Sequence, residues 1–178
     1  IGNLLSETTQ IFFDNVRVPQ RNLIGEEGKG FMMQMMQFQE ERLWCAANPL
    51  RAMEKTIDAT IEYCNQRMAF GQSIMSNQSI HFKLSELQTE IEALRSLVYR
   101  ATEEYVAGND VTKLASMAKL KVGRLTRDVH DSCIQYWGGM GYMDDNIASR
   151  GWRDGRLVSI AGGTDEIMLN IISKYLNP

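Results

Sequence analysis

Apolar side chains recur at alternating spacings of four and three residues through the middle of the chain, and this periodicity limits the possible folds. One stripe lies between residues 80 and 105: Ile80, Leu84, Leu87, Ile91, Leu94, Val98, Ala101 and Tyr105. Another lies between residues 111 and 133: Val111, Ala115, Ala118, Val122, Leu125, Val129 and Cys133. Such spacing gathers apolar groups on one face of an α-helix. The sequence therefore predicts long helices that pack along these faces.

Turn residues predict where these helices end. Gly108-Asn109-Asp110 separates the two stripes, and Gly138-Gly139 ends the second. Further helices are predicted from about Gly30 to Met68 and from Thr164 to Tyr175. The stripe of the first continues in phase across Pro49, which favours a kink over a break. Short links between long helices predict an all-α fold, an antiparallel up-down four-helix bundle with a short C-terminal helix.

The start of the chain has a different pattern. The stretch TTQIFFDNVRVP, at residues 8–19, is rich in Thr, aromatic and branched residues and ends at a proline, which is typical of a strand and its exit. One strand has no partner for its hydrogen bonds. We therefore expect residues 1–24 to be the end of a truncated β-domain, and residues 25–178 to form the helical bundle.

Composition excludes several classes of function. Hydrophobic residues make up 44% and charged residues 23%, as in ordinary globular proteins. A net charge of −3 gives no electrostatic reason to expect nucleic acid as a partner. No apolar run approaches the roughly 20 residues of a membrane span. The 3 cysteines and 2 histidines show no metal-ligand spacing and no disulfide framework, so we expect no metal and a reducing compartment.

Four stretches, in this order and spacing, resemble the acyl-CoA dehydrogenase family: FFDNVRVPQRNLIGEEGKGF, QRMAFGQSIMSNQSIHFKLSEL, IQYWGGMGYMDDNIASRGWRDGR and GGTDEIM. The resemblance implies the family's C-terminal helical domain, in an FAD enzyme that desaturates acyl-CoA thioesters between the α and β carbons. It also implies a dimer or tetramer and an acceptor similar to electron-transfer flavoprotein. The expected location is the cytoplasm in a bacterium or the mitochondrial matrix in a eukaryote.

The catalytic base is the main departure from the family's common pattern. Many members carry a carboxylate immediately before the Gly-Thr pair of the last motif, where this chain has Gly162. Other members, similar to the isovaleryl-CoA and long-chain dehydrogenases, carry it on the first long helix within Glu-Arg-Leu. This chain has Glu41-Arg42-Leu43, so the resemblance implies Glu41 as the base. Periodicity alone does not separate Glu41 from Glu40, and both also fit a solvated helix surface.

The resemblance assigns further roles residue by residue. The Gly162 backbone N–H is expected to face the thioester carbonyl, where a fixed donor stabilises developing negative charge. Substrate contacts are expected from Arg42, on the CoA side, and from Gly163 and Lys174. Thr164 and Glu166 match contacts to FAD in their own subunit. Contacts to FAD of a neighbouring subunit are expected from Arg67, Phe70, Gln78, Gln135, Gly138 and Gly139.

Three functions stay open on the sequence alone. The first is the FAD-dependent dehydrogenase, with Ala161 and Gly162 leaving room for long or branched acyl groups. The second is a related acyl-CoA oxidase, which performs the same half-reaction and passes electrons to oxygen. The third is a catalytically silent scaffold relative, which Gly162 would favour if Glu41 were absent.

Overall fold

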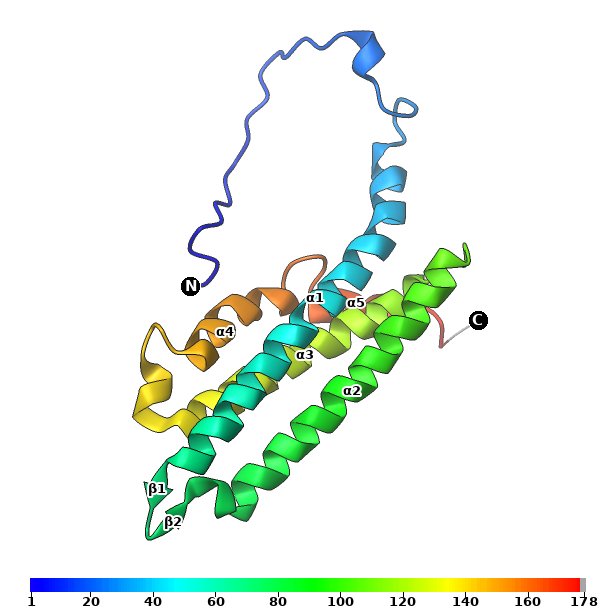
Figure 1. Ribbon diagram of the computed structural model, residues 1–178. Coiled ribbons are helices and arrows are strands. Elements are labelled where there is room, and N and C mark those ends of the chain that lie inside the picture. The colour runs from blue at the N-terminus through cyan, green and yellow to red at the C-terminus, as the bar shows by residue number, and fades with distance from the viewer. Residues whose placement is uncertain (177–178) are drawn as a thin grey trace.

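Three long helices lie side by side and two short helices pack against them in the computed structural model, which describes residues 1–176 (Figure 1). The α-helices are α1 (Gly30–Gln66), α2 (Gln78–Val106), α3 (Thr112–Trp137), α4 (Ile147–Gly155) and α5 (Asp165–Ser173). Short 3-10 helices cover Gln20–Asn22, Ile74–Ser76, Gly138–Tyr142 and Arg156–Ser159. The predicted all-α fold is confirmed.

The long helices end close to the predicted turn residues. Gly108, just past α2, has a φ of +82°, and Gly138, at the end of α3, has a φ of +60°. Only glycine adopts such angles without strain, so the chain reverses direction at these points. Between α1 and α2 the chain makes a small hairpin instead, in which β1 (Met68–Ala69) pairs antiparallel with β2 (Gln72–Ser73).

Helix α1 is 37 residues long and continues through Pro49. Proline has no N–H, so the hydrogen bond to the carbonyl four residues earlier is absent there. Leu50, Met53 and Ile57 still lie on one buried face, with exposures of 7%, 0% and 0%. Burial of this face compensates for the lost bond, and the prediction that Pro49 does not break the helix is confirmed. The first turns of α1 project beyond the other long helices (Figure 1).

The core lies where the predicted stripes meet. Leu87, Leu94 and Val122 are each 0% exposed and belong to one cluster with the buried face of α1. Tyr105, at the end of its stripe, is 39% exposed because it lies beyond this cluster. The sequence predicts that Ile167, Ile171 and Ile172 of the C-terminal helix point inward, but in α5 Ile167 is 47% exposed and Met168 is the buried residue instead. One residue of error in helical phase accounts for this difference.

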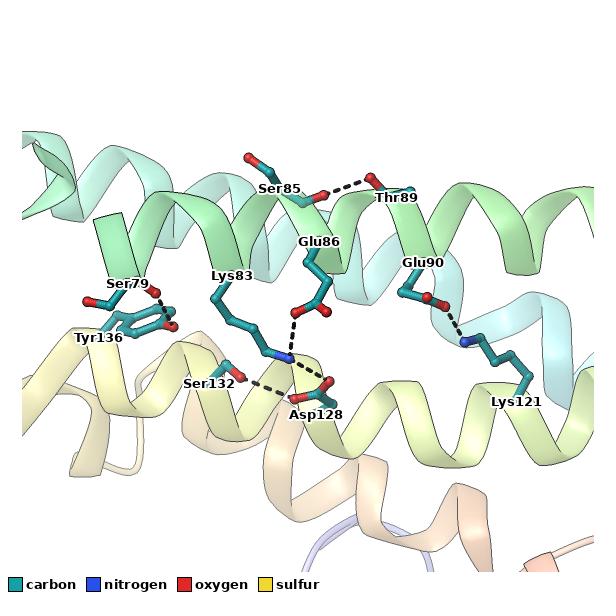
Figure 2. Close-up of polar contacts among 10 residues, drawn as sticks. All are labelled: Ser79, Lys83, Ser85, Glu86, Thr89, Glu90, Lys121, Asp128, Ser132 and Tyr136. Atoms are coloured by element: carbon teal, nitrogen blue, oxygen red, sulfur yellow. Dashed lines mark hydrogen bonds and ion pairs between the residues drawn. The ribbon is translucent and has the colours of Figure 1, made fainter. Parts of the chain in front are cut away.

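Ion pairs join the outer faces of α2 and α3 (Figure 2). Lys83 lies 3.0 Å from Asp128 on α3 and 3.2 Å from Glu86 on its own helix. Two turns further along, Lys121 pairs with Glu90. Each exposed pair contributes about 0–1 kcal/mol, so these contacts favour one register of the two antiparallel helices more than they stabilise the fold.

Helix α4 packs very closely on α3 because two glycines face it. A Cβ at Gly151 would overlap the ring of His130, and a Cβ at Gly155 would lie 2.6 Å from Thr126 Cγ2. Glycines four residues apart share one helix face and let the two backbones approach. Periodicity did not predict α4, since nine residues are too few to show a stripe.

The predicted strand near the N-terminus does not form. Residues 1–19 run as an extended segment outside the helical bundle and pair with no strand among residues 1–176 (Figure 1). A strand requires hydrogen bonds to a neighbour, and no neighbour is present there. Phe12 and Phe13 are accordingly 83% and 81% exposed. One polar contact joins this segment to α4, where the Asn3 N–H donates to Asp154 Oδ1 at 2.6 Å.

His130 gives the fold a pH-dependent stability. It is 2% exposed, its Nδ1 lies 2.8 Å from the Thr126 carbonyl oxygen, and its Nε2 has no partner within residues 1–176. Burial lowers the pKa of this imidazole below its ordinary value. Below about pH 6.5 the unfolded chain therefore binds a proton that the folded chain does not. The free energy of unfolding consequently decreases as the pH is lowered.

We expect His130→Gln to remove this contribution. The slope of unfolding free energy against pH, measured by urea unfolding between pH 5 and 8, decreases in the variant by up to about 1.4 kcal/mol per pH unit below pH 6.5. Above pH 7 the two proteins keep a constant difference in stability. Identical slopes for both proteins would show that His130 binds a proton as easily when folded.

Candidate active site

The structure brings Glu41 and Gly162 together. Glu41 is half-buried on α1, and Gly162 lies in the turn before α5. A Cβ built on Gly162 would lie 3.7 Å from Glu41 Oε1 and 3.6 Å from Cys45 Sγ. A side chain at position 162 would therefore enter the space that the Glu41 carboxylate borders. Glu41 is the base that the family resemblance implies, and position 162 is where many members of that family carry a carboxylate instead.

Glu40 faces a different neighbour. Its side chain is exposed, and its Oε2 accepts a hydrogen bond from the Tyr105 hydroxyl at 3.3 Å, at the end of α2. This negative charge raises the pKa of the Tyr105 phenol. Adjacent residues on a helix point about 100° apart, so only one of the two glutamates borders the turn before α5. That residue is Glu41.

Two buried cations hold the turn. Gly162 and Gly163 have φ angles of +65° and +103°. The Nε of Arg42, on α1, donates to the Gly162 carbonyl oxygen at 3.4 Å. The Nζ of Lys119, on α3, donates to the Gly163 carbonyl oxygen. Within residues 1–176 the N–H groups of Gly162, Gly163 and Thr164 donate to no protein acceptor, so they are free to bind a ligand.

Arg42 lies deeper than expected for a residue on the CoA side of the substrate. It is 7% exposed, and its guanidinium stacks on Phe38 with 5.3 Å from Cζ to the ring centroid. Burial lowers the pKa of Arg42, an effect that the neighbouring Glu41 charge partly opposes. The sequence did not predict a role for Lys119. Its position four residues after the buried Ala115 was the available signal, since that spacing predicts an inward side chain.

An open groove of about 530 Å³ lies next to Cys45 and Ala161, although neither Glu41 nor Gly162 lines it. Cys45 lines it and also lies next to the Gly162 position, so the groove begins near the carboxylate. Burial and then the Glu41 charge raise the pKa of the Cys45 thiol, which therefore stays protonated at neutral pH. Mostly apolar groups form the walls, including Trp44, Pro49, Ala52, Ile147, Leu157, Val158 and Ala161. Such walls fit an aliphatic chain.

A second group of predicted residues gathers at the far end of α1. Arg67 ends the helix, and its Nη1 donates to the Tyr63 hydroxyl at 3.2 Å and to the Trp137 carbonyl at 3.3 Å. A Cβ on Gly138 would lie only 2.8 Å from that nitrogen, so the arginine needs a glycine there. Phe70, at the tip of the hairpin, has a φ of +52° and is fully exposed.

Three more predicted residues lie near this end. Gln78 begins α2, exposed Gln135 lies in the last turn of α3, and exposed Gly139 follows α3 with open space at its Cα. Arg67 follows Glu41 by 26 positions, or about 39 Å along the helix. The predicted residues therefore form two separate groups within one chain. We call Glu41, Arg42, Gly162 and Gly163 the Glu41 group. The Arg67 group consists of Arg67, Phe70, Gln78, Gln135, Gly138 and Gly139.

Comparison with known proteins decides the family. Residues 28–176 match the family described as acyl-CoA dehydrogenase, C-terminal domain. The chain belongs to the acyl-CoA dehydrogenase family. An acyl-CoA dehydrogenase of Bacillus subtilis is 40% identical over 176 residues, which cover 99% of this chain and 46% of the relative. The long-chain specific mitochondrial enzyme of Sus scrofa is 36% identical over 176 residues, covering 99% of this chain and 41% of the relative.

The solved structures agree with this membership. Butyryl-CoA dehydrogenase from Megasphaera elsdenii superimposes with a TM-score of 0.89 and 36% identity, covering 93% of this chain and 43% of that chain. The chain thus spans less than half the length of the acyl-CoA dehydrogenases that it matches. The family resemblance inferred from the four sequence motifs is confirmed.

In this member of the family, Thr164 and Glu166 lie at the start of α5, beside the Glu41 group. The Thr164 hydroxyl caps the helix by accepting from the Ile167 N–H at 3.3 Å. The pKa of the exposed Glu166 carboxyl is lowered, first by a hydrogen bond to its own backbone N–H and then by the Thr164 hydroxyl. Lys174 is exposed at the opposite end of α5, about 12 Å from Glu166 along the helix axis, so the structure does not bring it to this group.

The described chain has neither a metal site nor a membrane-spanning helix. Among residues 1–176, no three His, Cys, Asp or Glu side chains converge as metal ligands would. No helix of the described chain is both long enough and apolar enough to cross a bilayer.

Proposed function

We propose that the protein carrying this chain is an FAD-dependent acyl-CoA dehydrogenase, and that Glu41 is its catalytic base. The observation that carries the proposal is the Glu41 carboxylate 3.7 Å from the Cβ position of Gly162, with Cys45, which lines an apolar groove, 3.6 Å from the same position. A carboxylate close to backbone N–H groups that have no protein acceptor suits proton removal from the carbon next to a thioester carbonyl.

In the proposed reaction Glu41 removes the α-proton. Negative charge then develops on the thioester carbonyl oxygen, and the free Gly162 N–H stabilises it without reorganisation. Arg42 holds the carbonyl of the same glycine and keeps the turn in place. Bound FAD supplies the acceptor for the β-hydride. An acceptor similar to electron-transfer flavoprotein would then reoxidise the enzyme.

The two groups of residues fit FAD in an oligomer. The N-terminus of α5, with Thr164 and Glu166, adjoins the Glu41 group and suits the FAD of the same subunit. The Arg67 group, about 39 Å away, suits the FAD of a neighbouring subunit. An exposed arginine fork with a glycine and a glutamine nearby matches the chemistry of a pyrophosphate. We therefore propose a homodimer or homotetramer, with residues 25–178 as its helical domain.

The groove gives the proposed substrate. It takes an aliphatic acyl group, and neither Ala161 nor Gly162 has a large side chain that would shorten it. Trp44, 64% exposed, forms part of its wall. We propose a long or branched acyl-CoA as the substrate. From membership of the family we propose the bacterial cytoplasm or the mitochondrial matrix as the location.

Anaerobic mixing of the full-length flavoprotein with a panel of acyl-CoA thioesters tests this function. At least one long or branched thioester is expected to bleach the flavin and yield the α,β-unsaturated product. Reoxidation by a flavoprotein acceptor but not by oxygen distinguishes a dehydrogenase from an oxidase. If no acyl-CoA of any length or branching bleaches the flavin, the proposed function is wrong.

Arg67→Ala is expected to weaken FAD retention. A charge-assisted hydrogen bond to phosphate contributes roughly 1.5–3 kcal/mol, so the dissociation constant for FAD increases about 10-fold or more. Flavin content after gel filtration and dilution measures the effect. Affinity for acyl-CoA changes little, because Arg67 lies about 39 Å from Glu41. Full flavin retention in the variant contradicts the role of Arg67.

A further inference from the structure

Lys119 is a fully buried lysine with no role in the reaction described above. It is 0% exposed within α3, where a charged amine is costly unless it is paired. Burial lowers the pKa of its amine, and the neighbouring Asp165 charge opposes that effect. Its Nζ donates to a backbone carbonyl, that of Gly163. Because burying an amine destabilises the fold unless the amine is paired, a specific contact must favour a lysine at this position of α3.

The turn that Lys119 contacts is intrinsically soft. Gly162 and Gly163, at φ angles of +65° and +103°, have backbones that rotate more freely than those of other residues. Arg42 holds the first carbonyl at 3.4 Å, and Lys119 holds the second. The two donors come from α1 and α3, so the turn is fixed to both long helices.

Holding these carbonyls also aims the N–H groups. In a trans peptide the C=O and the following N–H point in opposite directions. The Arg42 contact therefore orients the N–H of Gly163, and the Lys119 contact orients the N–H of Thr164. Both N–H groups are without a protein acceptor among residues 1–176. Rotation of either peptide would redirect a donor and would also move Gly162 relative to Glu41.

An acidic neighbour keeps the lysine in place. Asp165 is 7% exposed, and its Oδ2 lies 2.9 Å from Arg127. Its Oδ1 is buried without a hydrogen-bond partner in the described chain. Arg124 Nε also lies 4.0 Å from the same Oδ2. With both arginines nearby, the Asp165 carboxylate still raises the pKa of the Lys119 amine. It thus favours the ammonium form of Lys119 behind the turn.

We propose that Lys119 is a positioning residue, which fixes the Gly162–Thr164 backbone against Glu41 without touching the reacting atoms. Its expected effect on turnover rests on the proposed function. The contact between Lys119 and the Gly163 carbonyl does not depend on that function. In Lys119→Met a side chain of similar length and apolar character replaces the amine, so the turn loses one of its two anchors while the core remains filled.

Two measurements on the full-length holoenzyme test the proposal. In Lys119→Met, kcat is expected to fall about 10- to 100-fold, as small misplacements of catalytic groups do, while KM stays within about twofold. The pH dependence of kcat/KM keeps its shape, since Lys119 transfers no proton. Exchange of the hydrogen-bonded amides that flank the turn, those of Ala161 and Met168, becomes faster, whereas exchange in α1 is unchanged.

Lys121→Met is the matched control. Lys121 lies on the same helix, half-exposed and paired with Glu90, and its variant is expected to keep both kcat and the exchange rates (Figure 2). Lys119→Gln, which retains a shorter amide donor, is the second variant and is expected to lose less activity. Unchanged kcat or unchanged exchange beside the turn in Lys119→Met overturns the proposal, as does a loss in Lys119→Gln that exceeds the loss in Lys119→Met. Should no acyl-CoA reduce the wild-type flavin, the exchange measurement still decides whether Lys119 holds the turn.

Discussion

Glu41→Gln is expected to abolish reduction of the flavin by acyl-CoA while the protein still folds and binds both FAD and thioester. Glutamine has almost the size and helix propensity of glutamate but accepts no proton. A positioned general base accelerates proton transfer by about 10²- to 10⁴-fold, so the rate of anaerobic bleaching in stopped flow decreases by about 1,000-fold or more. Binding and chemistry are thereby separated.

Glu40→Gln is the control for this variant. It changes the adjacent residue on the same helix, but its side chain lies against Tyr105 rather than against the turn before α5. Most of the activity is expected to remain. The pKa of the Tyr105 phenol is expected to fall toward its ordinary value, because the Glu40 charge is the main cause of its rise. Bleaching of the Glu41→Gln protein at the wild-type rate would show that this carboxylate is not the base.

The contrast between Glu40 and Glu41 marks the limit of sequence reasoning at the site. Both glutamates have apolar helical neighbours, so periodicity ranks neither above the other. Only the fold shows which one borders Gly162, since that depends on how α1 is rotated against a turn some 120 residues later. The motif resemblance supplied the choice, and the geometry provides its physical reason.

The fold was predictable where many residues repeat one pattern. The stripes of α1, α2 and α3 bury their apolar positions because 3.6-residue periodicity averages over several turns. Short elements carry less signal. Helix α4 depends on Gly151 and Gly155, and its packing is visible only against the His130 ring. The strand predicted within residues 8–19 has suitable residues but no partner in the described chain.

The buried cations were the hardest feature to predict. Arg42 and Lys119 both lie in helices where arginine and lysine usually face solvent. Their inward orientation is explained by two backbone carbonyls in a glycine turn, and such acceptors leave no mark in a sequence. Charge composition therefore gave no indication of the two cations that are buried beside the glycine turn.

Moving the proposed base from position 41 on α1 to position 162, in the turn before α5, is the most demanding test of this geometry. In the double variant Glu41→Gly with Gly162→Glu, the new carboxylate starts from a Cβ within 3.7 Å of the place that Glu41 Oε1 occupies. We expect bleaching by acyl-CoA to be faster than in Glu41→Gly alone. Recovery stays about 100-fold below the wild type, because small errors in the position of a catalytic group are costly.

The backbone explains why recovery is partial. Gly162 has a φ of +65°, where a residue with a side chain costs roughly 1–2 kcal/mol, and glycine inside α1 costs about 1 kcal/mol more. Glu41→Gly with Gly162→Gln carries the same strain without a base, so the ratio of the two bleaching rates isolates proton transfer. A ratio near one, in proteins that retain FAD, would mean that positions 41 and 162 do not share the α-carbon. A ratio of ten or more places both carboxylates around the same proton.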